Sequence, residues 1–203
     1  MRVERKVFFG TALTVFSVPI GDAAVSMCIG RSEEPDAPGT VVFVDAQRLL
    51  DAWRADTRHH LHSIASGGPS TWPNDYKFQS AVDGFASHER SPVPLAQWTV
   101  CHNGVVAERS RFDPSMPLGP GHEEVRLCAY PIDGVTRTIW LLTQGAEVLP
   151  IHCFSPAEGA LMAEACGIPG LEPISIKELT AMTATGAISI EAPAAAPTRR
   201  FHP

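Results

Sequence analysis

The residues best suited to chemistry lie in the segment Asp133-Gly-Val-Thr-Arg-Thr138, between a predicted strand and a predicted helix. The first backbone N–H groups of a helix lack partners within the helix, and the helix dipole favours an anion there. Gly134 lets a phosphate approach the backbone, Thr136 and Thr138 offer hydroxyls, and Arg137 offers a planar fork for two phosphate oxygens. The segment predicts a phosphate cradle. An ordinary strand-to-helix turn with a surface arginine is the alternative that these residues alone leave open.

Other reactive side chains give weaker signals. His59-His60-Leu-His62 has no acidic or cysteine companion nearby and is more typical of a solvated helix end, so we predict no metal site. The adjacent pairs Cys101-His102 and His152-Cys153 fall in strand-like segments, where neighbours point to opposite faces and do not form a nucleophile–base couple. The cysteines are odd in number, lack a C-x-x-C pair, and predict buried, non-catalytic thiols of a reducing compartment: Cys28, Cys101, Cys128, Cys153 and Cys166.

Composition limits the classes of function. A chain of 203 residues with 44% hydrophobic residues suits one domain with extensions. Its net charge of -6 argues against a broad phosphate-neutralising surface, so any DNA contact must be local, with Arg109 and Arg111 as candidates. No apolar run reaches the roughly 18 residues that a membrane span requires.

The N-terminal segment has two interpretations. Residues 1–6 are basic and Val7 to Ile20 is mostly apolar, which resembles a secretory signal, but no clear small-x-small cleavage site follows Pro19. The other interpretation of residues 1–24 is a strand that joins the sheet. We predict an N-terminal strand or hairpin extension over residues 1–39, with Val25–Gly30 and Thr40–Val44 paired as a hairpin.

The elements that must position the cradle follow from periodicity and caps. Asp45 caps one predicted helix, and Asn74 or Asp75 caps another with Phe78, Ala81, Val82 and Phe85 on its apolar face. Downstream we predict a strand over 95–100, a proline-rich excursion over 103–122, a strand over 125–129, a turn over 131–134, a helix over 135–144 and a strand over 148–153. Capping signals at Ser155 and Ser175 open two further helices, and the Ala/Pro-rich tail, residues 191–203, is predicted to be disordered. The class is therefore α/β (α+β).

Two motifs in this order resemble the ParB/sulfiredoxin superfamily. One is Asp-Gly-x-x-Arg, a helix, Gly145, and a strand; the other is Lys77-Phe-Gln-Ser80, where the superfamily's lysine and serine contact the base and sugar of a nucleotide. The resemblance implies a mixed sheet with flanking helices over residues 40–190, a core at 77–153, and ATP bound by Lys77, Ser80, Gly134, Thr136, Arg137 and Thr138. Val135 replaces the sulfiredoxin cysteine, which excludes peroxiredoxin repair. Thr136 and Gly84 also depart from the superfamily pattern.

The segments around Trp72, Tyr76-Lys-Phe78, Gly84-Phe-Ala86, Pro92-Val-Pro-Leu-Ala96 and Asp133–Leu142 resemble the plasmid fertility inhibition factors. This resemblance implies a cytoplasmic protein that blocks DNA export through a type IV secretion system, associated with the inner face of the inner membrane through that apparatus. It implies ATPase and DNase activity, with Asp133 and Arg137 as candidate catalytic residues and a divalent cation such as Mg²⁺ as a further candidate cofactor. The alternative is a non-catalytic protein that occupies the coupling protein or transfer complex. No carboxylate cluster of a two-metal nuclease is visible in the sequence.

Overall fold

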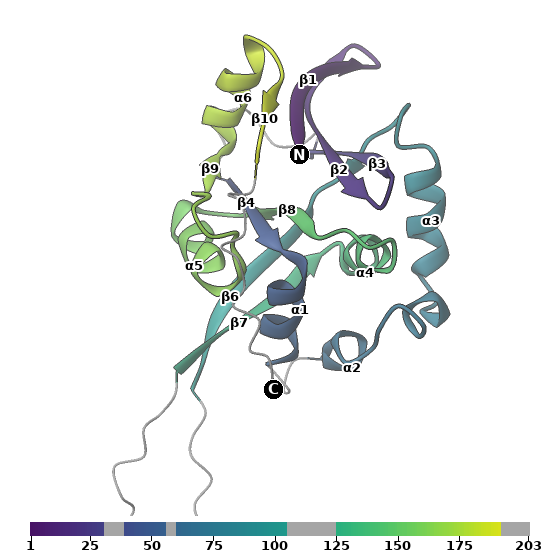
Figure 1. Cartoon of the computed structure of the whole chain (residues 1–203), viewed down its shortest axis with the longest axis vertical. Coiled ribbons are helices and arrows are strands. Elements are labelled where there is room, and N and C mark those ends of the chain that lie inside the picture. Colours follow the sequence, from purple (N-terminus) through teal and green to yellow (C-terminus); the bar gives the residue numbers. More distant parts are fainter. Residues whose placement is uncertain (31–38, 56–59, 105–124, 192–203) are drawn as a thin grey trace, which may run out of the picture.

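The computed structural model describes residues 1–30, 39–55, 60–104 and 125–191 (Figure 1). Two five-stranded mixed sheets with flanking helices form an α+β fold, which confirms the predicted class. Most of the predicted excursion, residues 105–122, and of the predicted C-terminal tail, residues 192–203, falls outside the described residues. Asn103 and Gly104, predicted to begin the excursion, instead end a strand.

The first sheet is built mainly from the N-terminal residues. Its order is β10 (Ile188–Ser189), β1 (Arg2–Phe8), β2 (Thr11–Ile20), β3 (Ala23–Cys28) and β5 (Val93–Pro94). Strands β1, β2 and β3 form an antiparallel meander, and β5 pairs parallel to β3. Residues 1–24 therefore form strands in this structure.

The second sheet carries the residues around the predicted cradle. Its order is β7 (Val125–Asp133), β6 (Ala96–Gly104), β8 (Val148–Cys153), β4 (Thr40–Asp45) and β9 (Ile174–Ser175). Strands β6 and β8 are parallel, whereas the other neighbours are antiparallel. The predicted turn over 131–134 is wrong because β7 continues to Asp133. Pro131 is tolerated there since β7 is an edge strand, where a missing N–H costs little.

The predicted hairpin between Val25–Gly30 and Thr40–Val44 is also wrong. Both segments are strands, but β3 pairs with β2 and β5, whereas β4 pairs with β8 and β9. Strand β4 is almost wholly buried, so it needs a neighbour on each edge and cover on both faces. A two-stranded hairpin cannot supply that environment.

The helices largely start where their caps predict. They are α1 (Ala46–Arg54), α2 (His62–Ala65), the 3₁₀ turn η1 (Trp72–Asn74), α3 (Phe78–Ala86), α4 (Val135–Thr143), α5 (Pro156–Cys166) and α6 (Ile176–Ala184). Asp45, Ser155 and Ser175 accept the backbone N–H three residues on at 2.8, 3.2 and 3.1 Å. Helix α3 differs, because Lys77 is its N-cap and Asp75 instead accepts the Lys77 N–H at 2.9 Å.

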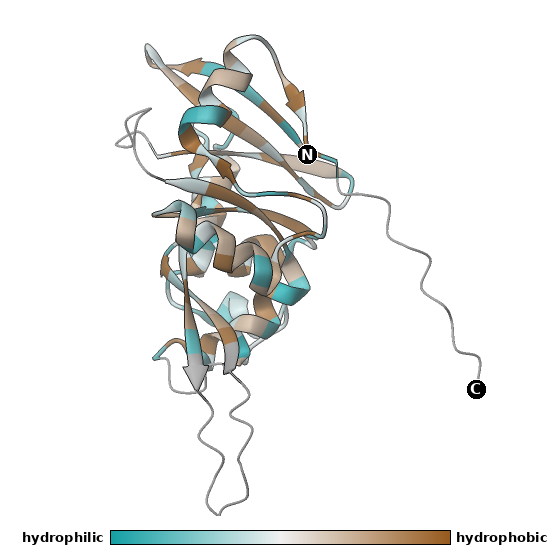
Figure 2. Cartoon of the chain, turned by 90° about the vertical axis from the view of Figure 1, so that its left-hand side faces the viewer, coloured by the Kyte–Doolittle hydropathy of each residue, from teal (hydrophilic) through white to brown (hydrophobic). Residues whose placement is uncertain are grey.

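The core continues from one sheet to the other. Phe16 of β2 lies 6.2 Å, centroid to centroid, from Phe43 of β4, so the first sheet covers one face of the second. Trp53 of α1 meets Trp98 of β6 edge-on at 5.2 Å, and α1 and α5 pack beside these strands. Figure 2 shows the first sheet above the second, with hydrophobic and hydrophilic residues alternating along its strands. The N-terminal strands are thus part of the same hydrophobic core.

Candidate functional site

The predicted cradle lies where β7 gives way to α4. Gly134 is the N-cap of α4 at a φ of +88°, in the left-handed region that favours glycine. A Cβ at this position would lie 2.8 Å from the Cα of Ala96 on β6. A glycine is therefore required here for both conformation and space, but the group that approaches its backbone is β6.

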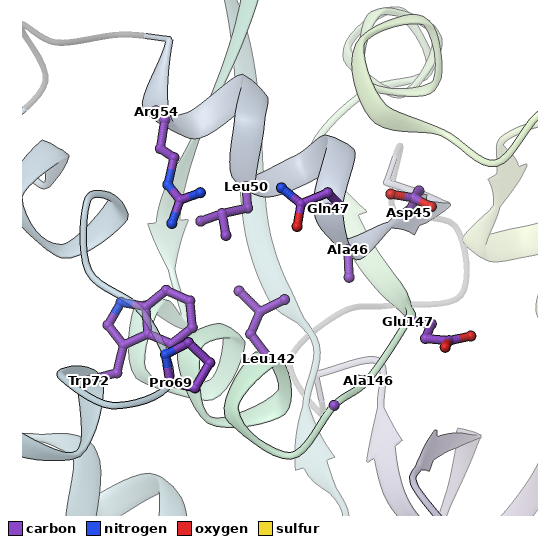
Figure 3. Close-up of a pocket in the computed structure, with 11 residues that line it drawn as sticks. Asp45, Ala46, Gln47, Leu50, Arg54, Pro69, Trp72, Leu142, Ala146 and Glu147 are labelled. Carbon is purple, nitrogen blue, oxygen red and sulfur yellow. The ribbon is translucent and has the colours of Figure 1, made fainter. Parts of the chain in front are cut away.

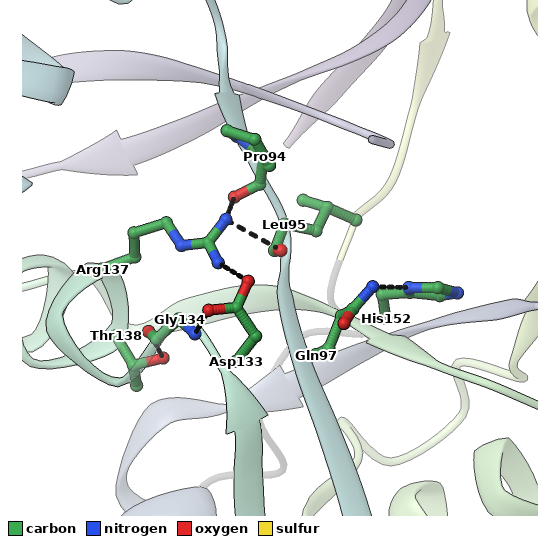
Figure 4. Close-up of polar contacts among 8 residues, drawn as sticks. All are labelled: Pro94, Leu95, Gln97, Asp133, Gly134, Arg137, Thr138 and His152. Atoms are coloured by element: carbon green, nitrogen blue, oxygen red, sulfur yellow. Dashed lines mark hydrogen bonds and ion pairs between the residues drawn. The ribbon is translucent and has the colours of Figure 1, made fainter. Parts of the chain in front are cut away.

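The guanidinium of Arg137 is held by the chain itself (Figure 4). Its Nη1 donates to the carbonyl oxygens of Pro94 and Leu95 at 2.8 and 3.3 Å, and its Nη2 donates to Oδ2 of Asp133 at 2.5 Å. The Arg137 side chain is 14% exposed, whereas that of Asp133 is 67% exposed. In this structure the fork that was predicted to bind phosphate is occupied by the chain itself: Arg137 clamps the start of α4 to the β5–β6 segment, and Asp133 is the group that faces solvent.

The two threonines of the predicted cradle also differ in how far they are exposed. Thr138 is buried, and its hydroxyl donates to the carbonyl of Gly134 at 3.1 Å. This bond stays inside the helix, so the Thr138 hydroxyl is turned away from any ligand at the helix start. Thr136 lies in the first turn of α4 and is half-buried.

A cavity of about 470 Å³ borders the Asp133–Arg137 pair. Both sheets contribute to its wall, which includes Cys28, Gln97, Asp133, Arg137 and His152. Nε2 of Gln97 lies 3.4 Å from Nδ1 of the buried His152. Sequence reasoning missed Gln97 and His152 at this cavity, because no local pattern links two residues that are 55 positions apart.

Lys77 and Ser80 lie away from this cavity. Both are exposed at the start of α3, and neither lines the cavity beside Arg137. Helix α3 packs on α4 through Phe85 and Trp140, whose rings stack with their centroids 4.0 Å apart. Ser91 and Pro92, which follow the C-terminal end of α3, line the cavity beside Arg137. The start of α3 follows η1, which instead borders the C-terminal end of α4. The two predicted halves of the nucleotide site therefore do not border the same cavity in this structure.

A second cavity, of about 530 Å³, opens between α1, the η1 segment and the C-terminal end of α4 (Figure 3). Leu50, Trp72 and Leu142 give it an apolar wall, and Arg54 and Glu147 are among its polar groups. Arg54 donates to the carbonyls of residues 65 and 67 at 2.9 Å each, which fixes the loop before η1. None of the predicted site residues lines this cavity.

Four of the five cysteines are buried as predicted, whereas Cys101 on β6 is only partly buried. Burial raises the pKa of Cys153 and of Cys166 to about 12, so both stay protonated at neutral pH. Among the described residues, no group of three or more His, Cys, Asp or Glu side chains is placed to hold a metal ion. Of the predicted candidates, His59, Arg109 and Arg111 lie outside the described residues.

A comparison with known proteins identifies the family to which this chain belongs. A family model described as plasmid fertility inhibition factor (PFIN) matches residues 41–167, which include β6, β7, β8, most of β4, and the helices α3 and α4. The chain belongs to this family. The sequence resemblance to the plasmid fertility inhibition factors is thereby confirmed, and strands β1 to β3 precede the matched segment.

Two relatives of this fertility inhibition factor illustrate how far the likeness extends. "Protein osa" of Shigella flexneri is 29% identical over 139 residues, which make up 68% of this chain and 61% of that protein. The crystal structure of oncogenic suppression activity protein, a plasmid fertility inhibition factor, matches with a TM-score of 0.65 and 22% identity, covering 85% of this chain and 78% of that one. At that identity the structural match shows a shared fold. Within the described ranges, this fertility inhibition factor has no helix long and apolar enough to cross a membrane.

Proposed function

We propose that this protein inhibits plasmid fertility by blocking the export of DNA through a type IV secretion system. Membership of the fertility inhibition family supports this role. The coupling protein or transfer complex is the proposed partner, and the cytoplasm, at the inner face of the inner membrane, is the proposed place of action. The net charge of -6 limits DNA to local contacts.

We infer further that the protein acts as an enzyme, hydrolysing ATP and degrading DNA, with the Asp133–Arg137 cavity as its phosphate site. The observation that carries this proposal is the solvent-exposed Asp133 carboxylate, which neutralises a mostly buried arginine at the mouth of a 470 Å³ cavity. A phosphate oxygen that replaces Asp133 on Nη2 keeps the charge of Arg137 balanced. Asp133 would then be free to hold the Mg²⁺ that accompanies ATP, because Mg²⁺ is commonly bound through one carboxylate together with substrate phosphates. Lys77 and Ser80 remain proposed nucleotide contacts only if α3 moves.

The second candidate is a non-catalytic protein that occupies the transfer machinery. It is favoured by the internal pairing of Arg137, whose Nη1 and Nη2 already have acceptors within the chain. In this case the Asp133–Arg137 pair stabilises the fold, and inhibition depends on a contact surface elsewhere.

A comparison of Asp133→Asn with Asp22→Asn separates the two candidates. Asp22 is an exposed carboxylate in the turn between β2 and β3, which makes it a matched control. Phosphate release from ATP, cleavage of DNA and plasmid transfer frequency are measured for each variant. The enzymatic candidate predicts that Asp133→Asn loses about a hundredfold or more of hydrolysis, the usual scale when a group that stabilises transition-state charge is removed, and loses inhibition with it. Full inhibition without hydrolysis supports the interaction protein, whereas unchanged hydrolysis removes the catalytic role of this pair.

A further inference from the structure

The turn between β1 and β2 has an unusual residue for its conformation. Phe9 and Gly10 connect the paired residues Phe8 and Thr11, and both have positive φ, at 50° and 80°. Two-residue hairpin loops of this type strongly favour Asn-Gly, because a left-handed backbone is unfavourable for a residue with a bulky side chain. Phe9 is the one non-glycine residue with positive φ in the described chain. A strained position of this kind is a reason to look for a function.

The exposed side chains at this turn give a second reason to look for a function here. Phe9 is 82% exposed and Val7 is 71% exposed, although both are large and apolar. Alternation along β1 places Arg5 and Val7 on the same side of the strand. The hairpin therefore presents apolar side chains to solvent next to a basic one.

The outer edge of β1 gives a third reason to look for a function at this hairpin. Strand β10 pairs with β1 only at Arg2 and Val3. Among the described residues, no strand pairs with the outer edge of β1 from Glu4 to Phe8, and Figure 1 shows this part extending beyond β10. An edge that no strand pairs leaves backbone N–H and C=O groups able to accept an added strand, although α6 also contacts β1.

The charges on β1 select the kind of strand that fits. Arg2 and Lys6 lie 2.7 and 2.8 Å from the carboxylate of Glu4, and the hydrogen bond from Lys6 lowers the pKa of that carboxyl. Arg5 adds a further positive charge, so β1 is basic on a chain whose net charge is -6. A second copy of the chain that pairs antiparallel about Arg5 sets Glu4 opposite Lys6 but leaves Arg5 opposite its own copy, whereas an alternating acidic strand sets a carboxylate opposite Arg5. An acidic strand has complementary charges.

We propose that the β1–β2 hairpin is a docking element for an extended, acidic segment of a partner protein, which adds to the edge of β1 and covers Val7 and Phe9. The hairpin precedes residues 41–167, so this contact belongs to a part of the chain outside the family-matched segment. The inference rests on the proposed function in one respect: the partner is a component of the transfer machinery. The direct contact is testable without that assumption.

The direct test uses the peptide acetyl-(Glu-Val)₃-amide as probe and acetyl-(Lys-Val)₃-amide as control, added to ¹⁵N-labelled full-length protein. The acidic peptide is expected to shift the backbone amide signals of residues 4–9, and Arg5→Glu is expected to abolish those shifts. Absence of shifts along β1, or equal shifts with the lysine peptide, overturns the proposal. Dimerisation through β1 in analytical ultracentrifugation, lost in Arg5→Glu, would assign the edge to a second copy and also overturn it.

The cellular test uses Phe9→Asn, with Met182→Ser on α6 as a control at another exposed apolar side chain. Because asparagine tolerates the left-handed conformation, Phe9→Asn should raise Tm by roughly 2–4 °C. It should also weaken inhibition of transfer about tenfold or more, the usual effect of removing a buried aromatic contact. A more stable variant with full inhibition contradicts a docking role for Phe9. If the wild-type protein does not inhibit transfer, the proposed function fails while the peptide experiment still decides the hairpin.

Discussion

Replacement of Arg137 by alanine should destabilise the fold, because this side chain acts as a clamp. Its bonds to the carbonyls of Pro94 and Leu95 contribute roughly 1 kcal/mol each after allowance for partial solvent exposure. The pair with Asp133 adds about 0.3–0.5 kcal/mol, since that carboxylate is mostly exposed. The expected loss is about 2–3 kcal/mol in the free energy of unfolding, which corresponds to a fall in Tm of about 5–10 °C for a chain of this length.

Thermal melting followed by circular dichroism tests this value on Arg137→Ala, Arg137→Lys and Asp133→Asn. Lysine carries a point charge without the fork, so it should recover about half of the loss. Asp133→Asn should stay within about 0.5 kcal/mol of wild type, because the exposed oxygen that it replaces makes a weak contribution. A Tm for Arg137→Ala within 1 °C of wild type, inside the roughly 0.5 kcal/mol scatter of surface substitutions, would refute the clamp.

Two further predictions concern the glycine of the turn and the buried thiols. Gly134→Ala should lower the free energy of unfolding by about 2–4 kcal/mol, because alanine is strained in a left-handed backbone and its Cβ would meet the backbone of β6. Urea unfolding measures this loss, and a loss smaller than about 1 kcal/mol contradicts the close approach. Cys153 and Cys166 ionise at about pH 12 when folded but near the ordinary value of 9.0 when unfolded, so stability should fall as pH rises from about 9 towards 12. A Cys153→Ala/Cys166→Ala variant should lose less stability across that interval, and identical pH profiles would show that burial of the thiols does not perturb their ionisation.

Local signals in the sequence predicted the elements whose boundaries depend on local chemistry. The serines at 155 and 175 each stand three residues before a glutamate, and α5 and α6 begin where these caps place them. The strand predicted over 148–153 is β8, since a short apolar run before a capping box leaves little freedom. Pairing between strands was less predictable, because the alternation of apolar and polar residues identifies a strand but does not show which strand lies beside it. For this reason β3 and β4 were assigned to one hairpin although they belong to different sheets.

The candidate site was predictable in part for the same reason. Glycine at 134 was predicted for the approach of a phosphate, whereas the structure requires it for a left-handed backbone that lies close to β6. The pairing of Asp133 with Arg137 was also available from their spacing of four residues, which favours an ion pair over an open fork. The separation of Lys77 from the cavity beside Arg137 could not be predicted, because it depends on how α3 packs against α4 in the folded chain. The roles of Gln97 and His152 likewise depend on contacts between distant strands.

The pairing of β10 with β1 has a consequence for the order of folding during synthesis. The backbone of Met1 accepts a hydrogen bond from the N–H of Ile190, and its amino group donates to the Ile190 carbonyl at 2.8 Å across 189 positions. At the usual rate of about 5–20 residues per second, the ribosome needs roughly 10–40 s to deliver the strand that closes this sheet. The meander of β1 to β3 therefore waits with an open edge while the second sheet is still being made. Nascent chains are most exposed to mispairing and to chaperones during that interval, and a truncation before residue 188 would make that state permanent.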